Sequence, residues 1–473
     1  MSGDLDPLDW QGFEAQAARL LECAVVQLAG AKDGPVWQAF PESMKAEMRT
    51  DLPIKGAGYE AVAAQLAALL PYGVGNTHPR FFGWVHGSGG AASMLAEIAA
   101  AAMNANLGGR DHGAMYVEKQ VVAWVRQMFG FPDGASGLVV SGTSMATIVA
   151  LKAARDARIN ARAAGVGAHK LVGYASDQAH NCVARAFDML GLGSDALRAV
   201  PVNAAFEMDI TALRKMMAVD RAAGLEPFLL VGTAGSVNVG AFDDLAALAD
   251  IAKAEGLWLH IDGAFGAAGV LSDVLRPRLK GIERADSIAF DFHKWLHVNY
   301  DAGFVLLRDE ALHRAAFESA PDYLASSDRG LAAGRPWPVD YGPELSRGFR
   351  ALKIWAQITA LGTEALGAAI SRNCTQAKLL AEMIDAEPSL ERLAPVASSV
   401  VVFAHVDGDA VTEEIVLHLQ ESGLAVPSIT TVNGRRAVRV NITNHRTRDA
   451  DLRVLVDGCA RSNPSVAFVC IHG

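Results

Sequence analysis

The segment from Phe81 to Leu345 alternates short apolar runs with Ala-rich helical stretches, and this alternation limits the fold more than any other feature. The runs are apolar along their whole length, which is typical of parallel strands covered on both faces. They are SGLVVSG at 136–142, KLVGYAS at 170–176, PFLLVGTAG at 227–235, LWLHIDGA at 257–264 and SIAFDFHKW at 287–295. We therefore predict an α/β fold with a mostly parallel sheet, whose ligands bind beyond the carboxyl ends of the strands.

Two regions flank this large α/β domain, which we place at residues 81–345. Residues 1–80 contain two amphipathic helical patterns that cannot cover their own apolar faces. We expect this N-terminal arm to pack on a partner subunit. Residues 346–473 combine long helical patterns with apolar strand-like runs, which predicts a smaller C-terminal α+β domain.

The composition excludes several classes of function. The 473 residues carry 42 Lys and Arg against 52 Asp and Glu, so the chain is net acidic and lacks the basic cluster that nucleic-acid binding needs. The most apolar long stretch, Ala91 to Met103, contains Glu97 and is too short to span a bilayer. Five Cys without C-x-x-C spacing favour a reduced chain over a disulfide framework or a metal site. With no signal-peptide pattern visible, we expect a cytoplasmic enzyme with no metal and no contact to nucleic acid or membrane.

Lys294 is the most distinctive reactive residue. It follows an apolar strand, stands between His293 and Trp295, and has Phe290 and Phe292 close by in the sequence. Desolvation in such surroundings lowers the pKa of an amine, so we expect a neutral amine that can attack a carbonyl. A cofactor aldehyde held as a Schiff base is the economical use of this group.

Asp262 ends another strand, in the segment HIDGA. A buried carboxylate is costly unless it meets a cation, and a protonated pyridine nitrogen is such a cation. Gly263 and Ala264 are small enough for a flat ring to lie close to the backbone. Capping of the following helix is the alternative role for Asp262.

Three further strand ends carry hydroxyl or imidazole side chains. Gly142, Thr143 and Ser144 open a helix, where backbone N–H groups and the helix dipole favour an anion such as a phosphate. His180 is placed to lie over a cofactor ring, and Ser236, in the turn GTAGS, is placed to touch a ring substituent. Each element has an ordinary structural explanation, but five of them in succession are not well explained by coincidence.

These motifs resemble those of the pyridoxal-phosphate group II decarboxylases, of the aromatic-amino-acid decarboxylase type. The resemblance rests on HPRFFG at 78–83, SDQAH at 176–180, HIDGA at 260–264, HKW at 293–295, VNYD at 298–301 and FRALKIW at 349–355. It implies a fold-type I (aminotransferase-like) homodimer whose active site lies at the subunit interface and whose arm interlocks with the partner.

The resemblance also assigns roles around the cofactor, pyridoxal 5′-phosphate. It implies that Lys294 is the Schiff-base lysine, Asp262 the partner of the pyridine nitrogen and His180 the residue stacked on the ring. It further implies phosphate contacts for Thr143, Ser144 and His293, and it places Ala264 against the ring.

The implied reaction is decarboxylation of an L-amino acid to its amine and CO₂, with the cofactor as electron sink. Family members return a proton from a Tyr on a mobile loop. The corresponding loop, 326–345, is rich in Gly and Pro but has Trp337 or Pro338 near the expected position. Tyr341 is the candidate donor there, although it aligns more naturally with a structural aromatic. Without such a Tyr, decarboxylation-coupled oxidative deamination to an aldehyde is the alternative.

The substrate side of the site is ambiguous in the sequence. Trp84 and Tyr300 suit an aromatic side chain, which is the leading prediction. Asn106 and Arg110 stand where aromatic-selective members carry bulk, and Arg110 would suit an acidic substrate such as glutamate or a sulfinate. An aminotransferase needs an Arg in the small domain to hold the substrate carboxylate, and Arg436, Arg439 and Arg446 are available for this. Another fold-type I lyase or aminotransferase therefore remains an alternative.

Overall fold

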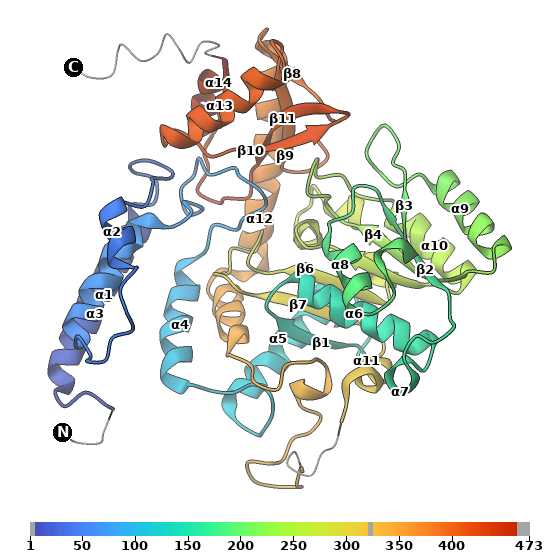
Figure 1. Ribbon diagram of the computed structural model, residues 1–473, viewed down its shortest axis with the longest axis horizontal. Coiled ribbons are helices and arrows are strands. Elements are labelled where there is room, and N and C mark those ends of the chain that lie inside the picture. The colour runs from blue at the N-terminus through green and yellow to red at the C-terminus, as the bar shows by residue number, and fades with distance from the viewer. Residues whose placement is uncertain (1–4, 320–324, 461–473) are drawn as a thin grey trace.

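A seven-stranded sheet forms the centre of the computed structural model, which describes residues 5–319 and 325–460 (Figure 1). Cys470 and the outer ends of the predicted arm and small domain lie outside the described residues. The strands are β1 (Ser136–Val140), β2 (Leu171–Ser176), β3 (Leu197–Val200), β4 (Glu226–Thr233), β5 (Trp258–Asp262), β6 (Ser287–Asp291) and β7 (Gly303–Leu307).

The spatial order of these strands is β1-β7-β6-β5-β4-β2-β3. Neighbouring strands from β6 across to β3 are parallel, whereas β7 runs antiparallel to both β6 and β1. The prediction of an α/β fold with a mostly parallel sheet is therefore confirmed, and the direction of β7 is the feature that the sequence pattern did not reveal.

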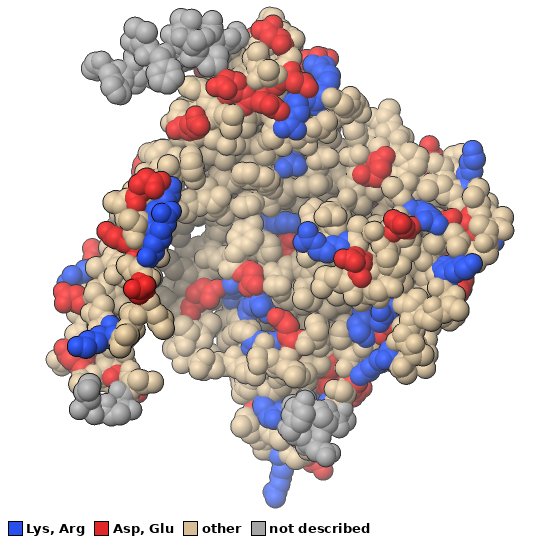
Figure 2. Space-filling view, viewed as in Figure 1, with Lys and Arg blue, Asp and Glu red and all other residues tan. Residues whose placement is uncertain are grey.

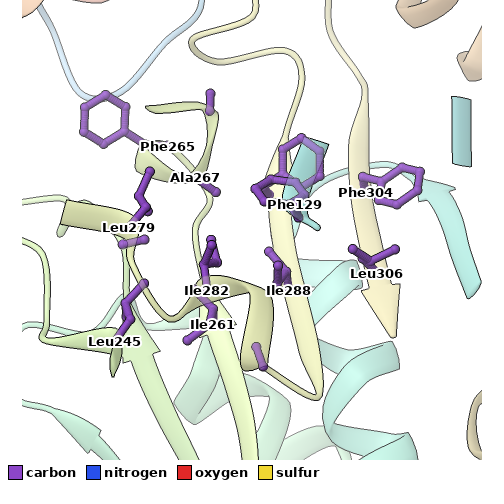
Figure 3. Close-up of a cluster of buried hydrophobic side chains, with 14 of the residues drawn as sticks. Phe129, Leu245, Ile261, Phe265, Ala267, Leu279, Ile282, Ile288, Phe304 and Leu306 are labelled. Atoms are coloured by element: carbon purple, nitrogen blue, oxygen red, sulfur yellow. The ribbon is translucent and has the colours of Figure 1, made fainter. Parts of the chain in front are cut away.

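Helices cover both faces of the sheet, which is why its strands are apolar along their whole length. Along β1, Val139 joins one core cluster, whereas Leu138 and Val140 join the cluster on the opposite face. Figure 3 shows part of the first cluster, where Ile261 of β5 and Ile288 of β6 lie among side chains from surrounding elements. The first face is covered by α5 (Gly113–Phe129), α9 (Ile210–Ala222), α10 (Leu245–Glu255) and α12 (Arg350–Ala386), and the second by α6 (Thr143–Arg158), α7 (Ala161–Ala164), α8 (Cys182–Met189) and α11 (Glu310–Phe317).

The chain before the sheet is helical and leaves much apolar surface uncovered. It comprises α1 (Trp10–Ala29), α2 (Glu42–Glu47), α3 (Tyr59–Leu69) and α4 (Ala91–Met103). Figure 1 shows α1 to α3 apart from the central sheet, with α4 between them and the sheet. α1 and α3 pack on each other, but neither contains a buried residue. In a single chain, the apolar faces predicted from the sequence remain open to solvent.

A second, antiparallel sheet lies at the far end of α12, with strand order β10-β11-β9-β8. It consists of β8 (Leu390–Arg392), β9 (Val400–His405), β10 (Ser428–Val432) and β11 (Arg435–Asn441), with α13 (Asp409–Glu421) and α14 (Asp449–Ala460) packed on it. α12 links the two sheets and is interrupted at Gly362, whose φ of +72° is not helical. The segment after the arm is tied to this sheet, because the Phe82 N–H donates to the Val426 carbonyl at 2.8 Å.

The surface charge is mixed on the face that Figure 2 shows, with Lys and Arg side chains interspersed among Asp and Glu. Within the described ranges, no helix is both long enough and apolar enough to cross a membrane.

Candidate active site

A cavity of about 200 Å³ opens at the carboxyl ends of β4 and β5. The parallel register pairs Thr233 with Asp262, which brings the ends of these two strands to one edge of the sheet. The cavity is lined by Trp84, Val85, His180, Thr233, Gly235, Val237, Asp262, Ala264, Phe265, Lys294 and Arg439. The structure thus brings together the predicted lysine, carboxylate, stacking imidazole, small residue and aromatic residue.

The amine of Lys294 is paired with a carboxylate. Its Nζ lies 3.0 Å from Oδ2 of Asp291, and its side chain is 21% exposed. Burial lowers the pKa of Lys294, but the charge and hydrogen bond of Asp291 and the charge of Asp262 outweigh it and raise that pKa above its ordinary value. The expectation of a neutral amine produced by desolvation alone is therefore wrong, because the neighbouring carboxylate favours the ammonium form.

Asp262 is a buried anion at the floor of the cavity. Its side chain is 3% exposed, and its Oδ1 accepts the Ala264 N–H at 3.1 Å. Its Oδ2 receives a weak hydrogen bond from the Cys182 thiol at 3.8 Å. Burial raises the pKa of Asp262, while the Ala264 N–H and the charges of His180 and Lys294 oppose this rise. Only one oxygen is used within the following turn, so the carboxylate still fits the predicted cationic ring nitrogen.

The first residues of α6 form the predicted phosphate cradle. The Thr143 N–H donates to Oδ1 of Asp291 at 2.7 Å, and the buried hydroxyl oxygen of Thr143 has no hydrogen-bond partner. The hydroxyl oxygen of Thr233, across the cavity, is buried without a partner as well. Two orphaned hydroxyls beside an amine and a carboxylate fit a ligand that brings its own polar groups, as pyridoxal phosphate does. Ser144 is exposed at the same helix end.

Three imidazoles surround the lysine. His180 uses its Nδ1 to accept the Cys182 N–H at 3.1 Å, which fixes the ring at the cavity wall. His293 uses its Nδ1 to accept the Ala302 N–H at 3.0 Å, and its ring packs on Tyr300 with centroids 4.3 Å apart. Sequence reasoning missed His86, whose buried Nδ1 has no partner and whose pKa is lowered by burial and by the charge of Lys294.

Several predicted residues are not brought to this cavity. Asn106 uses its Oδ1 to accept two backbone N–H groups and lines a separate cavity of about 600 Å³, next to Trp337. Ser236 uses its Oγ to accept the Ala241 N–H within its own turn. Tyr300 and His293, whose rings pack on each other, are not among the residues that line the cavity.

Tyr341, the predicted proton donor, also lies elsewhere. Its hydroxyl donates to Glu310, and its ring packs beside His313 with centroids 5.1 Å apart. Burial and the hydrogen bond to Glu310 raise the pKa of Tyr341. The loop therefore folds so that this tyrosine supports α11 and does not reach the cavity of the same chain.

Sequence reasoning did not identify Asp291 as a site residue, and it considered Arg439 only as one of three small-domain arginines that would suit an aminotransferase. Arg439, on β11, is 6% exposed and donates to the Ser428 hydroxyl at 3.1 Å and the Val237 carbonyl at 3.0 Å. Within the described part of the chain, no carboxylate pairs with it, and burial lowers its pKa. Asp291 stands at the end of a strand, like Asp262, and this position is the sequence signal that could have identified it.

Comparison with known proteins identifies the family to which the chain belongs. The family profile of the pyridoxal-dependent decarboxylase conserved domain matches residues 41–406. An aromatic-L-amino-acid decarboxylase from Bacillus atrophaeus is 32% identical over 408 residues, 83% of each chain. An L-2,4-diaminobutyrate decarboxylase from Rhizobium meliloti is 32% identical over 415 residues, 85% of this chain and 82% of the relative.

The solved structures agree with this comparison. One is the glutamate decarboxylase domain of a diaminobutyrate-pyruvate transaminase and L-2,4-diaminobutyrate decarboxylase from Vibrio parahaemolyticus. It aligns with a TM-score of 0.83 at 28% identity, covering 97% of this chain and 96% of that one. With a profile that matches most of its length and relatives at 32% identity, this chain belongs to the pyridoxal-dependent decarboxylases, lyases that use pyridoxal 5′-phosphate to remove the carboxyl group of an amino acid.

Proposed function

We propose that this enzyme decarboxylates an aromatic L-amino acid to its amine and CO₂, with the cofactor attached to Lys294. The lining of the cavity carries this proposal. Its polar groups are one carboxylate, Asp262, the cations Lys294 and Arg439, and the imidazole of His180, while the rest of the wall is largely apolar. Such a wall suits a flat, uncharged side chain.

Different residues of the chain have different roles in such a reaction. Bound pyridoxal phosphate supplies an electron sink for the bond that breaks. Asp262 supplies the negative charge that holds a proton on the ring nitrogen, and His180 orients the ring from its open face. Asp291 holds the Lys294 amine in place, with 3.0 Å between Nζ and Oδ2.

Arg439 is our candidate for the substrate's α-carboxylate. A buried guanidinium without a carboxylate partner is costly, and an incoming carboxylate relieves that cost through a charge-assisted hydrogen bond. The residue stands in the cavity wall opposite the cofactor residues of the large sheet. It can therefore orient the group that leaves as CO₂.

The relatives named above act on aromatic amino acids or diaminobutyrate, so the charge of the cavity has to discriminate between substrate classes. A basic side chain needs a second carboxylate, and among the described residues that line the cavity only Asp262 is acidic. An acidic side chain needs a cation besides Arg439, but Arg110 lies 4.9 Å above the Trp337 ring, in the other cavity. An aromatic substrate leaves no such group unpaired.

A second copy of the chain is the proposed cover for the arm. Leu95 on α4 and Leu361 on α12 are 65% and 48% exposed, and both line a cavity of about 720 Å³ that Val25 of α1 closes on the other side. Exposed apolar surface of this extent supports a homodimer. The four cysteines in the described chain are free thiols, which supports a cytoplasmic location.

Aldehyde formation is the second candidate outcome, and the position of Tyr341 supports it. Because the Tyr341 hydroxyl is bound to Glu310, it delivers no proton inside this cavity. If the substrate carbon is reprotonated slowly after CO₂ has left, dioxygen can react with that carbon instead. The balanced result is amino acid plus O₂ and H₂O giving aldehyde, CO₂, NH₃ and H₂O₂.

Product analysis tests both candidates. The enzyme is incubated with L-tryptophan, L-tyrosine, L-phenylalanine, L-histidine, L-glutamate, cysteine sulfinate and L-2,4-diaminobutyrate, and CO₂, amine, aldehyde and peroxide are quantified separately. We expect kcat/KM for an aromatic substrate to exceed that for the charged ones at least about tenfold, with one amine per CO₂. A preference for diaminobutyrate or glutamate contradicts the proposal, and peroxide equal to CO₂ establishes the aldehyde branch.

Borohydride reduction tests the attachment site. The wild-type protein should be yellow, lose that colour on reduction and yield a pyridoxyl-labelled peptide that contains Lys294. Lys294→Ala should carry no label, because no other amine is placed at the cavity wall. Lys280→Ala, which removes an exposed lysine, is the matched control and should label like wild type. A label elsewhere in the wild-type chain contradicts the assignment.

A further inference from the structure

Asp291 holds the backbone group that an incoming phosphate would use. It is the last residue of β6 and is 4% exposed. Its Oδ1 accepts the N–H of Thr143, the first residue of α6, at 2.7 Å. Its Oδ2 lies 3.0 Å from Lys294 Nζ and 3.5 Å from His293 Nε2. One carboxylate thus contacts a helix N-terminus, the reactive amine and an imidazole, all of which the family resemblance assigns to the cofactor.

The backbone around Asp291 is closely packed against the start of α6. Asp291 pairs with Gly303 across β6 and β7. A Cβ atom added to Gly303 would lie 2.3 Å from the Cα of Gly142, so the start of α6 is packed directly on the strand pair. The start of α6, with the Thr143 N–H, therefore cannot move away from the end of β6 unless these backbones separate, which close packing resists.

A phosphate monoester bound in this cradle meets a like charge. Both groups are anionic at neutral pH, and they draw on the same positive groups. Two such acids at close range in a buried site relieve their repulsion by sharing one proton. Oδ2 is the oxygen available for that proton, because Oδ1 is already engaged by the Thr143 N–H.

We propose that Asp291 is a positioning residue that makes capture of the cofactor's phosphate depend on uptake of one proton, shared between its Oδ2 and the phosphate. The inference deepens the proposed function and rests on the placement of the cofactor at Lys294. Before capture, the carboxylate neutralises the lysine and holds α6 in place. After capture, it binds the phosphate through the shared proton.

Some of the other titratable groups that face Asp291 favour its charged form, and others oppose it. Lys294 and His293, on its own β6–β7 connection, favour its charged form when they are protonated. Asp262 on β5 opposes that form, as does any negative charge on Tyr300 or on the Cys182 thiol of α8.

Asp291→Asn is the test variant, because it keeps the size of the side chain and the oxygen that accepts from Thr143 but supplies an N–H where the carboxylate needs a proton. The probe is pyridoxine 5′-phosphate, which has no aldehyde and binds without reacting with Lys294. Titration calorimetry of the full-length, cofactor-free proteins at pH 8, in two buffers of different ionisation enthalpy, counts the protons taken up. At pH 8 the phosphate is a dianion, so uptake reports on the protein.

We expect wild type to take up close to one proton per pyridoxine 5′-phosphate and Asp291→Asn close to none. The variant should bind the probe at least tenfold more tightly at pH 8, and the advantage should shrink towards pH 6. Pyridoxine, which lacks the phosphate, should bind both proteins alike, whereas a merely structural loss would weaken pyridoxine as well. Asp286→Asn, at the other end of β6, removes a carboxylate that accepts the Leu259 N–H at 2.7 Å and should behave like wild type.

Two results overturn the inference: no proton uptake by wild type at pH 8, or equal uptake by wild type and Asp291→Asn. The wild-type count decides the matter even if the variant fails to fold. A wild-type protein that labels at Lys294 with borohydride but shows no proton uptake contradicts the role of Asp291 alone. Absence of the Lys294 label contradicts the proposed function instead.

Discussion

The guanidinium of Arg439 is the side chain that we propose for binding the substrate and not the cofactor. It donates to Ser428 and to the Val237 carbonyl, and it faces the cavity from the small sheet. The cofactor residues Lys294 and Asp262 come from the large sheet. Removal of Arg439 should therefore affect the amino acid and spare the cofactor.

Arg439→Met is expected to raise KM for the aromatic substrate about 10- to 100-fold, because a charge-assisted hydrogen bond contributes about 1.5–3 kcal/mol. The dissociation constant of pyridoxal phosphate should change less than about threefold. Steady-state kinetics and cofactor titration measure the two quantities. Arg436→Met is the matched control, because Arg436 on the same strand pairs with Glu413 outside the cavity. Equal loss of cofactor and substrate affinity in Arg439→Met would contradict the assignment.

Residue identities were easier to predict than their electrostatics. Lys294, Asp262 and His180 could be found because each follows an apolar run, and parallel strands bring such positions together. The direction of the Lys294 pKa could not, because it depends on Asp291, three residues earlier, folding back within 3.0 Å. Sequence spacing does not reveal that contact in a turn.

At the scale of elements, strands and helices of the large sheet follow the predicted pattern, whereas the loop before α12 does not. β7 has the same apolar character as its neighbours, so composition gives no sign that it runs antiparallel. The loop was predicted to present Tyr341 to the substrate. Its path is instead set by contacts between distant residues, such as the Tyr341 hydroxyl with Glu310, which local sequence does not encode.

Tyr341→Phe should leave kcat and the ratio of amine to aldehyde unchanged, because the hydroxyl lies outside the cavity. Loss of its hydrogen bond to Glu310 should lower the free energy of unfolding by about 1 kcal/mol. Product quantification and urea denaturation check the two parts. A shift from amine towards aldehyde and peroxide in this variant would restore Tyr341 as the proton donor.

At the scale of the whole molecule, the open apolar faces of α1, α4 and α12 define the expected assembly. Leu95→Glu places a charge in the centre of the surface assigned to the second copy. Sedimentation equilibrium should give the mass of two chains for wild type and of one chain for the variant, because an unpaired charge buried at an interface is strongly unfavourable. Leu417→Glu, on the exposed face of α13, should remain dimeric. A monomeric wild type would contradict the homodimer.

Buried histidines predict how the whole fold responds to acid. Burial lowers the pKa of His260 to about 3 and of His313 to about 4, against 6.5 for the ordinary side chain. Below pH 6.5 the unfolded chain therefore binds protons that the folded chain does not, so stability falls as pH falls towards those values. Between pH 6.5 and 5 the two residues together should cost about 3 kcal/mol.

Urea denaturation at several pH values measures this loss. His260→Gln should reduce the slope of unfolding free energy against pH by close to one proton, and exposed His418→Gln should not change it. A pH-independent stability between 6.5 and 5 would show that these imidazoles do not titrate differently in the folded and unfolded chains.

The residues proposed for the reaction and those proposed for substrate recognition come from separate sheets. Lys294 and Asp262 belong to the large sheet, whereas the small sheet carries Arg439 and holds Trp84 through the Asn441 side-chain amide, which donates to the Trp84 carbonyl at 3.1 Å. Random libraries confined to 81–85 and 426–441 would therefore sample new amino-acid preferences while Lys294, Asp262 and His86 stay unaltered, which makes this pair of segments the natural starting point for retargeting the enzyme.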